Sequence, residues 1–118
     1  MKDSIVQNKS FAFAVQTIKI CQYLTEIRHE YNLSKQLIRS STSIGANIRE
    51  ARRAQSAADF VAKMSISLKE AEESRYWYEL LEASEYISSQ QGEQMIEMCD
   101  EIVKMLSSIV KTMREKNS

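Results

Sequence analysis

The sequence predicts an all-α fold, and more specifically an antiparallel up-down-up-down four-helix bundle. Two observations predict it. The 118-residue chain contains no proline and only two glycines, so few residues interrupt it as strands and tight hairpins would require. Apolar residues also recur at helical spacing in four stretches joined by links of a few residues, which places consecutive helices side by side and antiparallel. The length suits one core, and we expect a single domain over residues 1–118.

The first two helices are expected at about residues 8–29 and 35–55. Asn32 tolerates left-handed backbone and marks the end of the first helix, and Ser34 is a candidate N-cap for the second. The second helix has apolar residues within about 60° of one another on a helical wheel. They are Leu33, Leu37, Ile44, Ile48 and Ala51. Ser40 and Ser41 lie on or beside this face, and such small side chains predict a close crossing with a neighbouring helix.

The third and fourth helices are expected at about residues 57–87 and 90–113. Ser56 followed by Asp59 resembles a capping box, which places the start of the third helix after Ser56. The fourth helix follows the serines at 88 and 89 and carries a broad apolar arc.

The first and third helices carry more apolar surface than one bundle needs. Each has a second apolar series beside its core series, and extended exposed apolar patches are uncommon on monomers. We therefore predict a homo-oligomer and assign the second series to contacts between subunits. These candidate interface residues are Phe13, Ile20, Leu24, Ile27, Tyr31, Ile66, Trp77 and Leu81.

No arrangement of residues in the sequence indicates an enzyme, a cofactor or a metal site. His29 is the only histidine, and no nucleophile accompanies it at a recognisable spacing. Cys21 and Cys99 fall at apolar helical positions, as buried thiols do. No apolar run reaches the roughly 18 residues of a membrane span, and we expect a cytoplasmic protein with no membrane partner.

The second helix carries a local excess of positive charge although the net charge of the chain is zero. Residues 33–57 balance at +4 and residues 58–87 at −4. Four of the basic residues project within about 80° of one another opposite the apolar face, and the fifth lies about 60° outside them. This basic stripe consists of Lys35, Arg39, Arg49 and Arg53, with Arg52 beside them. Such a stripe can follow a phosphate backbone, or it can be solvated or form ion pairs with the acidic third helix of a neighbouring subunit.

The segment RSSTSIGANIREA at 39–51, followed by DFVAKMSISLKEAEESRYWYELL at 59–81, resembles the bacterial 23S rRNA intervening-sequence proteins. These are four-helix-bundle proteins described as ribosomal-protein-like, and the resemblance extends over nearly the whole chain. It implies a ring-like assembly, with a homopentamer as the expected form. The family is also similar to the accessory protein of diversity-generating retroelements, a basic pentamer that binds nucleic acid and a reverse transcriptase. The zero net charge of this chain departs from that basic character.

Two functional hypotheses follow. The first is a non-enzymatic accessory protein that contacts RNA or DNA through the basic stripe. The alternative is a scaffold that binds another protein, with the stripe engaged in ion pairs between subunits and no nucleic acid bound.

Overall fold

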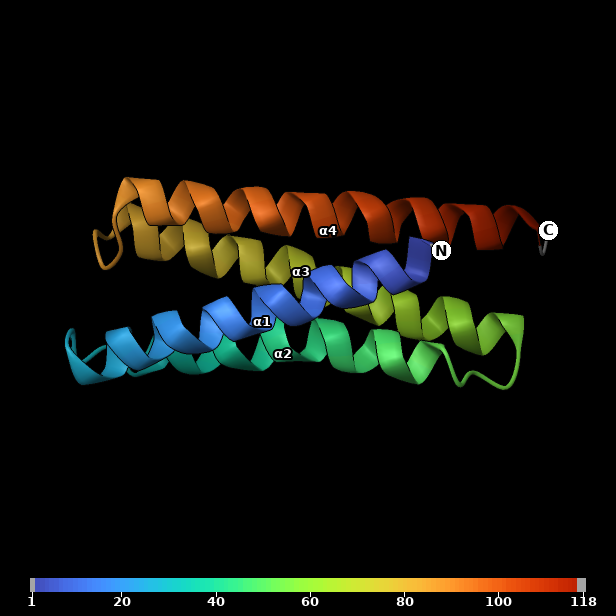
Figure 1. The fold of residues 1–118 in the computed structure, drawn as a ribbon, viewed down its shortest axis with the longest axis horizontal. Helices are drawn as coiled ribbons and strands as arrows, with labels where there is room; N and C mark the ends of the chain where they lie inside the picture. The colour runs from blue at the N-terminus through green and yellow to red at the C-terminus, as the bar shows by residue number, and fades with distance from the viewer. Residues whose placement is uncertain (1, 117–118) are drawn as a thin grey trace.

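The computed structural model describes residues 2–116, and their side chains from Ile5 onward. It consists of four helices that pack against one another in a body of about 48 × 21 × 20 Å (Figure 1). The helices are α1 (Lys2–Glu26), α2 (Asn32–Ala51), α3 (Ala57–Ala83) and α4 (Ser89–Lys116). The predicted all-α class with four packed helices is confirmed.

Consecutive helices run in opposite directions, and α4 returns to lie beside α1. Each helix therefore has two neighbours, and backbones on the diagonals of the bundle do not approach each other. The link between α2 and α3, the start of α1 and the end of α4 lie at one end of the bundle (Figure 1). The α1–α2 link and the α3–α4 link lie at the opposite end. The two ends of the bundle are therefore formed by different segments of the chain.

The start of α2 differs from the prediction because Glu30, and not Ser34, caps the helix. The Glu30 carboxylate accepts hydrogen bonds from the backbone N–H groups of Asn32, Leu33 and Ser34 at 2.8–3.2 Å. A carboxylate at this position satisfies N–H groups that have no partner within the helix. The Ser34 hydroxyl is buried and donates to the Glu30 carbonyl oxygen at 2.8 Å, so the helix begins three residues before the predicted start.

Left-handed backbone ends α1 and α3 earlier than the apolar pattern suggested. His29 has φ of 55° after α1, and Glu85 has φ of 62° after α3. Neither conformation continues a right-handed helix. The helices therefore end at Glu26 and Ala83, where we expected residues 29 and 87.

The predicted starts of α3 and α4 agree closely with the structure because serine side chains cap both. The Ser56 hydroxyl accepts a hydrogen bond from the Asp59 backbone N–H at 3.0 Å. The Ser88 hydroxyl accepts one from the Gln91 N–H at 3.1 Å. Local sequence thus decides both starts.

Small side chains hold α2 close to α3, as predicted from Ser40 and Ser41, which are both fully buried. The Ser40 and Ser74 hydroxyl groups are hydrogen-bonded at 2.8 Å across the interface. Ser67 of α3 donates to the Ile44 carbonyl oxygen of α2 at 2.8 Å. These contacts bring the helix surfaces together and leave no hydroxyl of this group unsatisfied.

Within the core, Tyr78 of α3 reaches across the bundle to α1. Its hydroxyl group is 2.6 Å from the Thr17 hydroxyl, and its ring meets the Phe13 ring edge-on with centroids 5.9 Å apart. Both aromatic residues are fully buried. The contact joins diagonal helices, so it fixes the rotation of α1 relative to α3.

Four of the predicted interface residues belong to this core. Phe13, Ile20, Leu24 and Leu81 have exposed fractions of 0 to 4% within the single chain, and their assignment to contacts between subunits is wrong. The physical reason is the phase of α1. Either of its two apolar series could have faced inward, and the Tyr78 contact selects the series that contains Phe13.

We expect Tyr78→Phe to lower the free energy of unfolding by about 1–3 kcal/mol, because it leaves the buried Thr17 hydroxyl without its partner. Urea denaturation would measure the change. In the double variant Thr17→Val, Tyr78→Phe, both polar groups are absent, and much of the loss should be recovered. A Tyr78→Phe protein as stable as the wild type would contradict a role for this hydrogen bond.

Candidate nucleic-acid interface on helix two

The structure divides the basic stripe into two parts. Lys35, Arg39 and Arg49 are exposed on α2. The predicted helix extended to residue 55 and included Arg52 and Arg53. In the structure both residues follow Ala51, the last residue of α2, so they do not continue the stripe along the helix. Their backbone N–H groups bond to the carbonyl oxygens of residues 48 and 50 in a final tight turn, and both side chains remain exposed.

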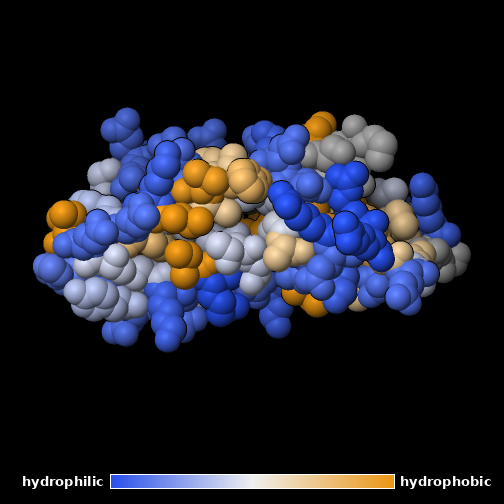
Figure 2. Space-filling view, turned by 60° about the horizontal axis from the view of Figure 1, so that its bottom comes forward, coloured by the Kyte–Doolittle hydropathy of each residue, from blue (hydrophilic) through white to orange (hydrophobic). Residues whose placement is uncertain are grey.

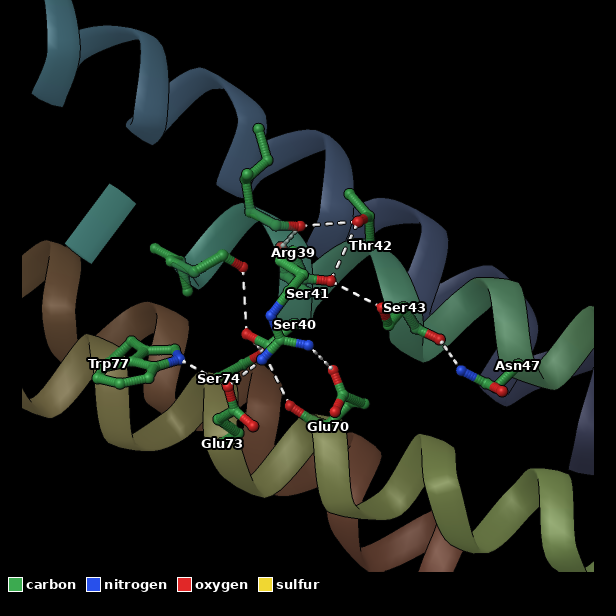
Figure 3. Close-up of polar contacts among 12 residues, drawn as sticks. Arg39, Ser40, Ser41, Thr42, Ser43, Asn47, Glu70, Glu73, Ser74 and Trp77 are labelled. Carbon is green, nitrogen blue, oxygen red and sulfur yellow. Dashed lines mark hydrogen bonds and ion pairs between the residues drawn. The ribbon is translucent and has the colours of Figure 1, made fainter. Parts of the chain in front are cut away.

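Arg39 forms ion pairs with two carboxylates of α3 in the same chain. Its guanidinium group donates to Glu70 at 3.0 Å and also contacts Glu73, and all three side chains point toward one another between the helices (Figure 3). Desolvation lowers the pKa of Arg39, but the two carboxylates outweigh it and the pKa is raised. Glu73 also accepts a hydrogen bond from the Trp77 indole N–H at 3.2 Å. Arg39 therefore makes an intramolecular contact and is not a free cation of the stripe.

Arg49, Arg52 and Arg53 have no carboxylate partner among the described residues. The Arg49 guanidinium lies 5.8 Å from the centre of the Phe11 ring, and Arg52 donates to the Gln7 side-chain oxygen at 2.8 Å. These contacts position two of the guanidinium groups without neutralising their charge. The three arginines form an exposed cationic cluster at the end of α2.

Lys35 lies near the opposite end of α2, beside a groove of about 330 Å³ between α1 and α2. Ile18, Tyr31 and Ile38 line the same groove. The lysine is exposed at the edge of this groove and is separated along the helix from the three arginines.

An exposed apolar face covers the outside of α1, next to α2. Phe11, Val15 and Ile18 have exposed fractions of 59, 36 and 38%. Figure 2 shows hydrophobic residues gathered on this side of the molecule, with hydrophilic residues around them. The assignment of Phe13, Ile20 and Leu24 to contacts between subunits implied the reverse arrangement of α1, with this face toward the core. The sequence shows that α1 carries two apolar series, but it does not show which of them faces outward.

The remaining predicted interface residues stay accessible to different degrees. Ile27, Tyr31 and Ile66 are exposed by 64, 59 and 45%, and Trp77 is half-buried. Ile27 and Tyr31 lie at the α1–α2 end of the bundle, whereas Ile66 lies on α3. These four residues thus belong to two parts of the chain, the α1–α2 link and α3.

The two cysteines and the histidine occupy different environments. Burial raises the pKa of Cys21 to about 11 and that of Cys99 to about 12, so both thiols are protonated at neutral pH. His29 is exposed, and its ring nitrogen lies 3.2 Å from the Tyr31 hydroxyl. In the described part of the chain, no three histidine, cysteine, aspartate or glutamate residues cluster as metal ligands would. No described helix is long and apolar enough to cross a membrane.

Comparison with known proteins gives a consistent result. The family described as 23S rRNA-intervening sequence protein matches residues 2–108. The chain is also similar to a protein of unknown function from Bacteroides thetaiotaomicron, described as a member of the S23 ribosomal protein family, whose crystal structure is known. The two sequences are 50% identical, the similarity covers 94% of this chain and 99% of the other, and the TM-score is 0.92. No curated protein matches significantly.

We expect Arg39→Gln to lower the free energy of unfolding by about 0.5–1 kcal/mol at low salt and by less at high salt, because the ion pairs are partly exposed. Thermal unfolding at two salt concentrations would measure this. Arg53→Gln is the matched control, since Arg53 has no carboxylate partner among the described residues. Equal effects of the two substitutions would contradict the role assigned to Arg39.

Proposed function

The chain belongs to the family of 23S rRNA-intervening sequence proteins, and from this premise we propose that it is a non-enzymatic, oligomeric accessory protein that binds the phosphate backbone of RNA or DNA. The cationic cluster of Arg49, Arg52 and Arg53 is the contact surface in this proposal. Two free, buried cysteines fit the reducing environment of the cytoplasm, where we place the protein.

The observation that carries the proposal is the contrast between Arg39 and the three arginines beyond it. Arg39 has two carboxylates at its guanidinium group. Arg49, Arg52 and Arg53 have none among the described residues, and they are exposed. Guanidinium groups form paired hydrogen bonds with phosphate oxygens, and phosphate binding releases condensed counterions, which favours association. A cluster of exposed arginines with no internal counterions is suited to this role.

RNA is the first polyanion to test. The family name refers to 23S rRNA, and the similar Bacteroides protein is described as belonging to a ribosomal protein family while its function is unknown. Neither description names a reaction. Contacts to phosphates carry no sequence information, so we expect binding through this cluster to depend little on sequence.

The proposal includes a ring-like homo-oligomer, with a pentamer expected from the family resemblance. The exposed apolar face of Phe11, Val15 and Ile18 is its contact surface on α1. Burial of about three such side chains removes a few hundred Å² of apolar surface from water, which favours association at about 25 cal/mol per Å². This face also supports the second candidate function, a scaffold that binds a different protein there.

We expect wild-type protein to bind a labelled RNA hairpin with an affinity that falls linearly with salt on a log–log scale. In the variant Arg49→Glu, Arg52→Glu, Arg53→Glu, each lost phosphate contact should reduce the slope by about 0.7 to 0.9. Fluorescence anisotropy over a salt series would measure both slopes. Arg39→Glu serves as a control for charge change on the same helix, and we expect it to alter stability more than the slope.

The binding proposal is wrong if the wild-type protein shows no affinity for RNA or duplex DNA even at low salt. Retention of the full wild-type slope by the triple variant would place the phosphate contacts elsewhere on the molecule. Light scattering on each variant must show an unchanged assembly for the comparison to hold.

We expect Phe11→Asp, Ile18→Asp to convert the oligomer into monomers without unfolding it, because both side chains are exposed in the single chain and charge would be desolvated at the interface. Light scattering and circular dichroism would measure assembly and helicity. Ile27→Asp is the matched control at a more exposed apolar residue outside this face. A wild-type monomer at micromolar concentration, or a double variant that still assembles, would exclude the proposed contact surface.

A further inference from the structure

The net charge of zero conceals a strong polarity along the bundle. We divide the described side chains at the middle of each helix. The basic half comprises residues 5–14, 42–69 and 103–116, and the acidic half comprises residues 15–41 and 70–102. The basic half has ten lysines and arginines against three carboxylates, a net charge of +7. The acidic half has five against twelve, a net charge of −7.

The outer face of α4 shows the change of sign most directly. Glu93 and Glu97 project from its first half, and Lys104 and Lys111 project from its second half. At 100° per residue, these four positions fall within about 40° of one another, opposite the buried side of the helix. All four side chains are exposed. One helix face therefore turns from acidic to basic as it passes the middle of the bundle.

Helix dipoles do not account for the polarity. A helix favours acidic residues near its N-terminus and basic residues near its C-terminus, and α4 follows this rule. On α3 the order is reversed, because basic residues predominate near its N-terminus and acidic residues near its C-terminus. Its first half contains Lys63 and Lys69 against Asp59, whereas its second half contains five glutamates against Arg75. Because α3 is antiparallel to α4, its charges agree with the polarity of the whole bundle and oppose its own dipole.

The basic half joins side chains from three helices at one end of the molecule. Arg114 of α4 reaches Ser65 of α3 at 3.5 Å. Lys63 of α3 forms an ion pair with Glu50 of α2 at 3.6 Å, which neutralises one of the three carboxylates of the basic half. The link between α2 and α3, to which Arg52 and Arg53 belong, lies at the same end of the bundle as the end of α4 (Figure 1). The cationic surface is therefore not confined to α2, and a ligand at the α2 arginines meets further positive charge toward α3 and α4.

We propose that the protein binds a folded nucleic acid through its basic half, on a phosphate-contacting surface that spans α2, α3 and α4, with the acidic half directed away. This inference rests on the proposed function and assigns it a surface and an orientation. The bundle is about 48 Å long, whereas electrostatic interactions in water decay over about 8 Å at physiological salt. The acidic half therefore does not cancel the attraction of the basic half for phosphates, and it repels the same polyanion if the molecule approaches in the opposite orientation.

A charge-swap variant tests the polarity separately from the net charge. The variant Glu93→Lys, Glu97→Lys, Lys104→Glu, Lys111→Glu changes the halves from +7 and −7 to +3 and −3, and its net charge remains zero. All four changes are on the exposed face of α4, and none of them is among the α2 arginines. We expect the affinity for a labelled RNA hairpin at low salt to fall about 10- to 100-fold, with a salt slope smaller by roughly 1.4 to 1.8 for two lost phosphate contacts.

A matched swap within one half is the control. Lys19→Glu, Glu26→Lys exchanges two exposed charges on α1 and leaves the acidic half at −7, so we expect wild-type binding. Unchanged binding by the four-residue swap, together with a loss in the Arg49, Arg52, Arg53 variant, would overturn binding across the basic half and keep the site on α2. An equal loss of affinity in the four-residue swap and in the control swap would also overturn this inference. Absence of binding by the wild-type protein would instead refute the proposed function itself. Circular dichroism and light scattering confirm that each swap variant keeps its fold and assembly before binding is compared.

Discussion

The close packing of α2 on α3 is the constraint on which the rest of the structure depends. The side chains of Ser40, Ser67 and Ser74 are small enough for the two helices to approach closely. Their hydroxyl groups form hydrogen bonds across the contact. This contact fixes the rotation of α2 about its axis. With the apolar side of α2 held inward, Arg39 lies over Glu70 and Glu73, and Arg49 projects outward from the next part of the helix. Packing of small polar residues thus decides which cations are neutralised and which are free to bind a ligand.

The distribution of charge, rather than its sum, connects this fold with its proposed function. A protein with no net charge has no long-range attraction for a polyanion, but screening in salt makes local charge decisive. Antiparallel helices can collect charge at one end only if their sequences change sign in opposite directions along the chain. In this protein, α3 changes from basic to acidic and α4 from acidic to basic, so both contribute to the same polarity. In a ring of parallel subunits, the basic ends would all lie on one side.

The fold was predictable from local patterns, whereas the surfaces were only partly so. Helical periodicity and the Ser56 cap place the elements because they depend on neighbouring residues. The identity of the inward face of α1 depends on Tyr78, which is 61 residues from its partner Thr17 in the sequence. Likewise, the sequence left open whether Arg39 contacts phosphates, is solvated or pairs with the acidic third helix, and the structure shows that it pairs with Glu70 and Glu73 of the same chain. The charge polarity was present in the sequence, but it becomes visible only when the antiparallel arrangement shows which residues share an end.

Lysine-reactivity footprinting is the most direct measurement of where a nucleic acid contacts the molecule. Acetylation of the protein with and without a bound RNA hairpin, followed by mass spectrometry, reports on each lysine without any substitution. The account predicts that RNA protects Lys104 and Lys111 in the basic half, while Lys19 and Lys35 in the acidic half remain as reactive as in the free protein. Protection of Lys19 and Lys35 with Lys104 and Lys111 unchanged would contradict it, because contact would then follow α1 and α2 on the acidic side of the bundle.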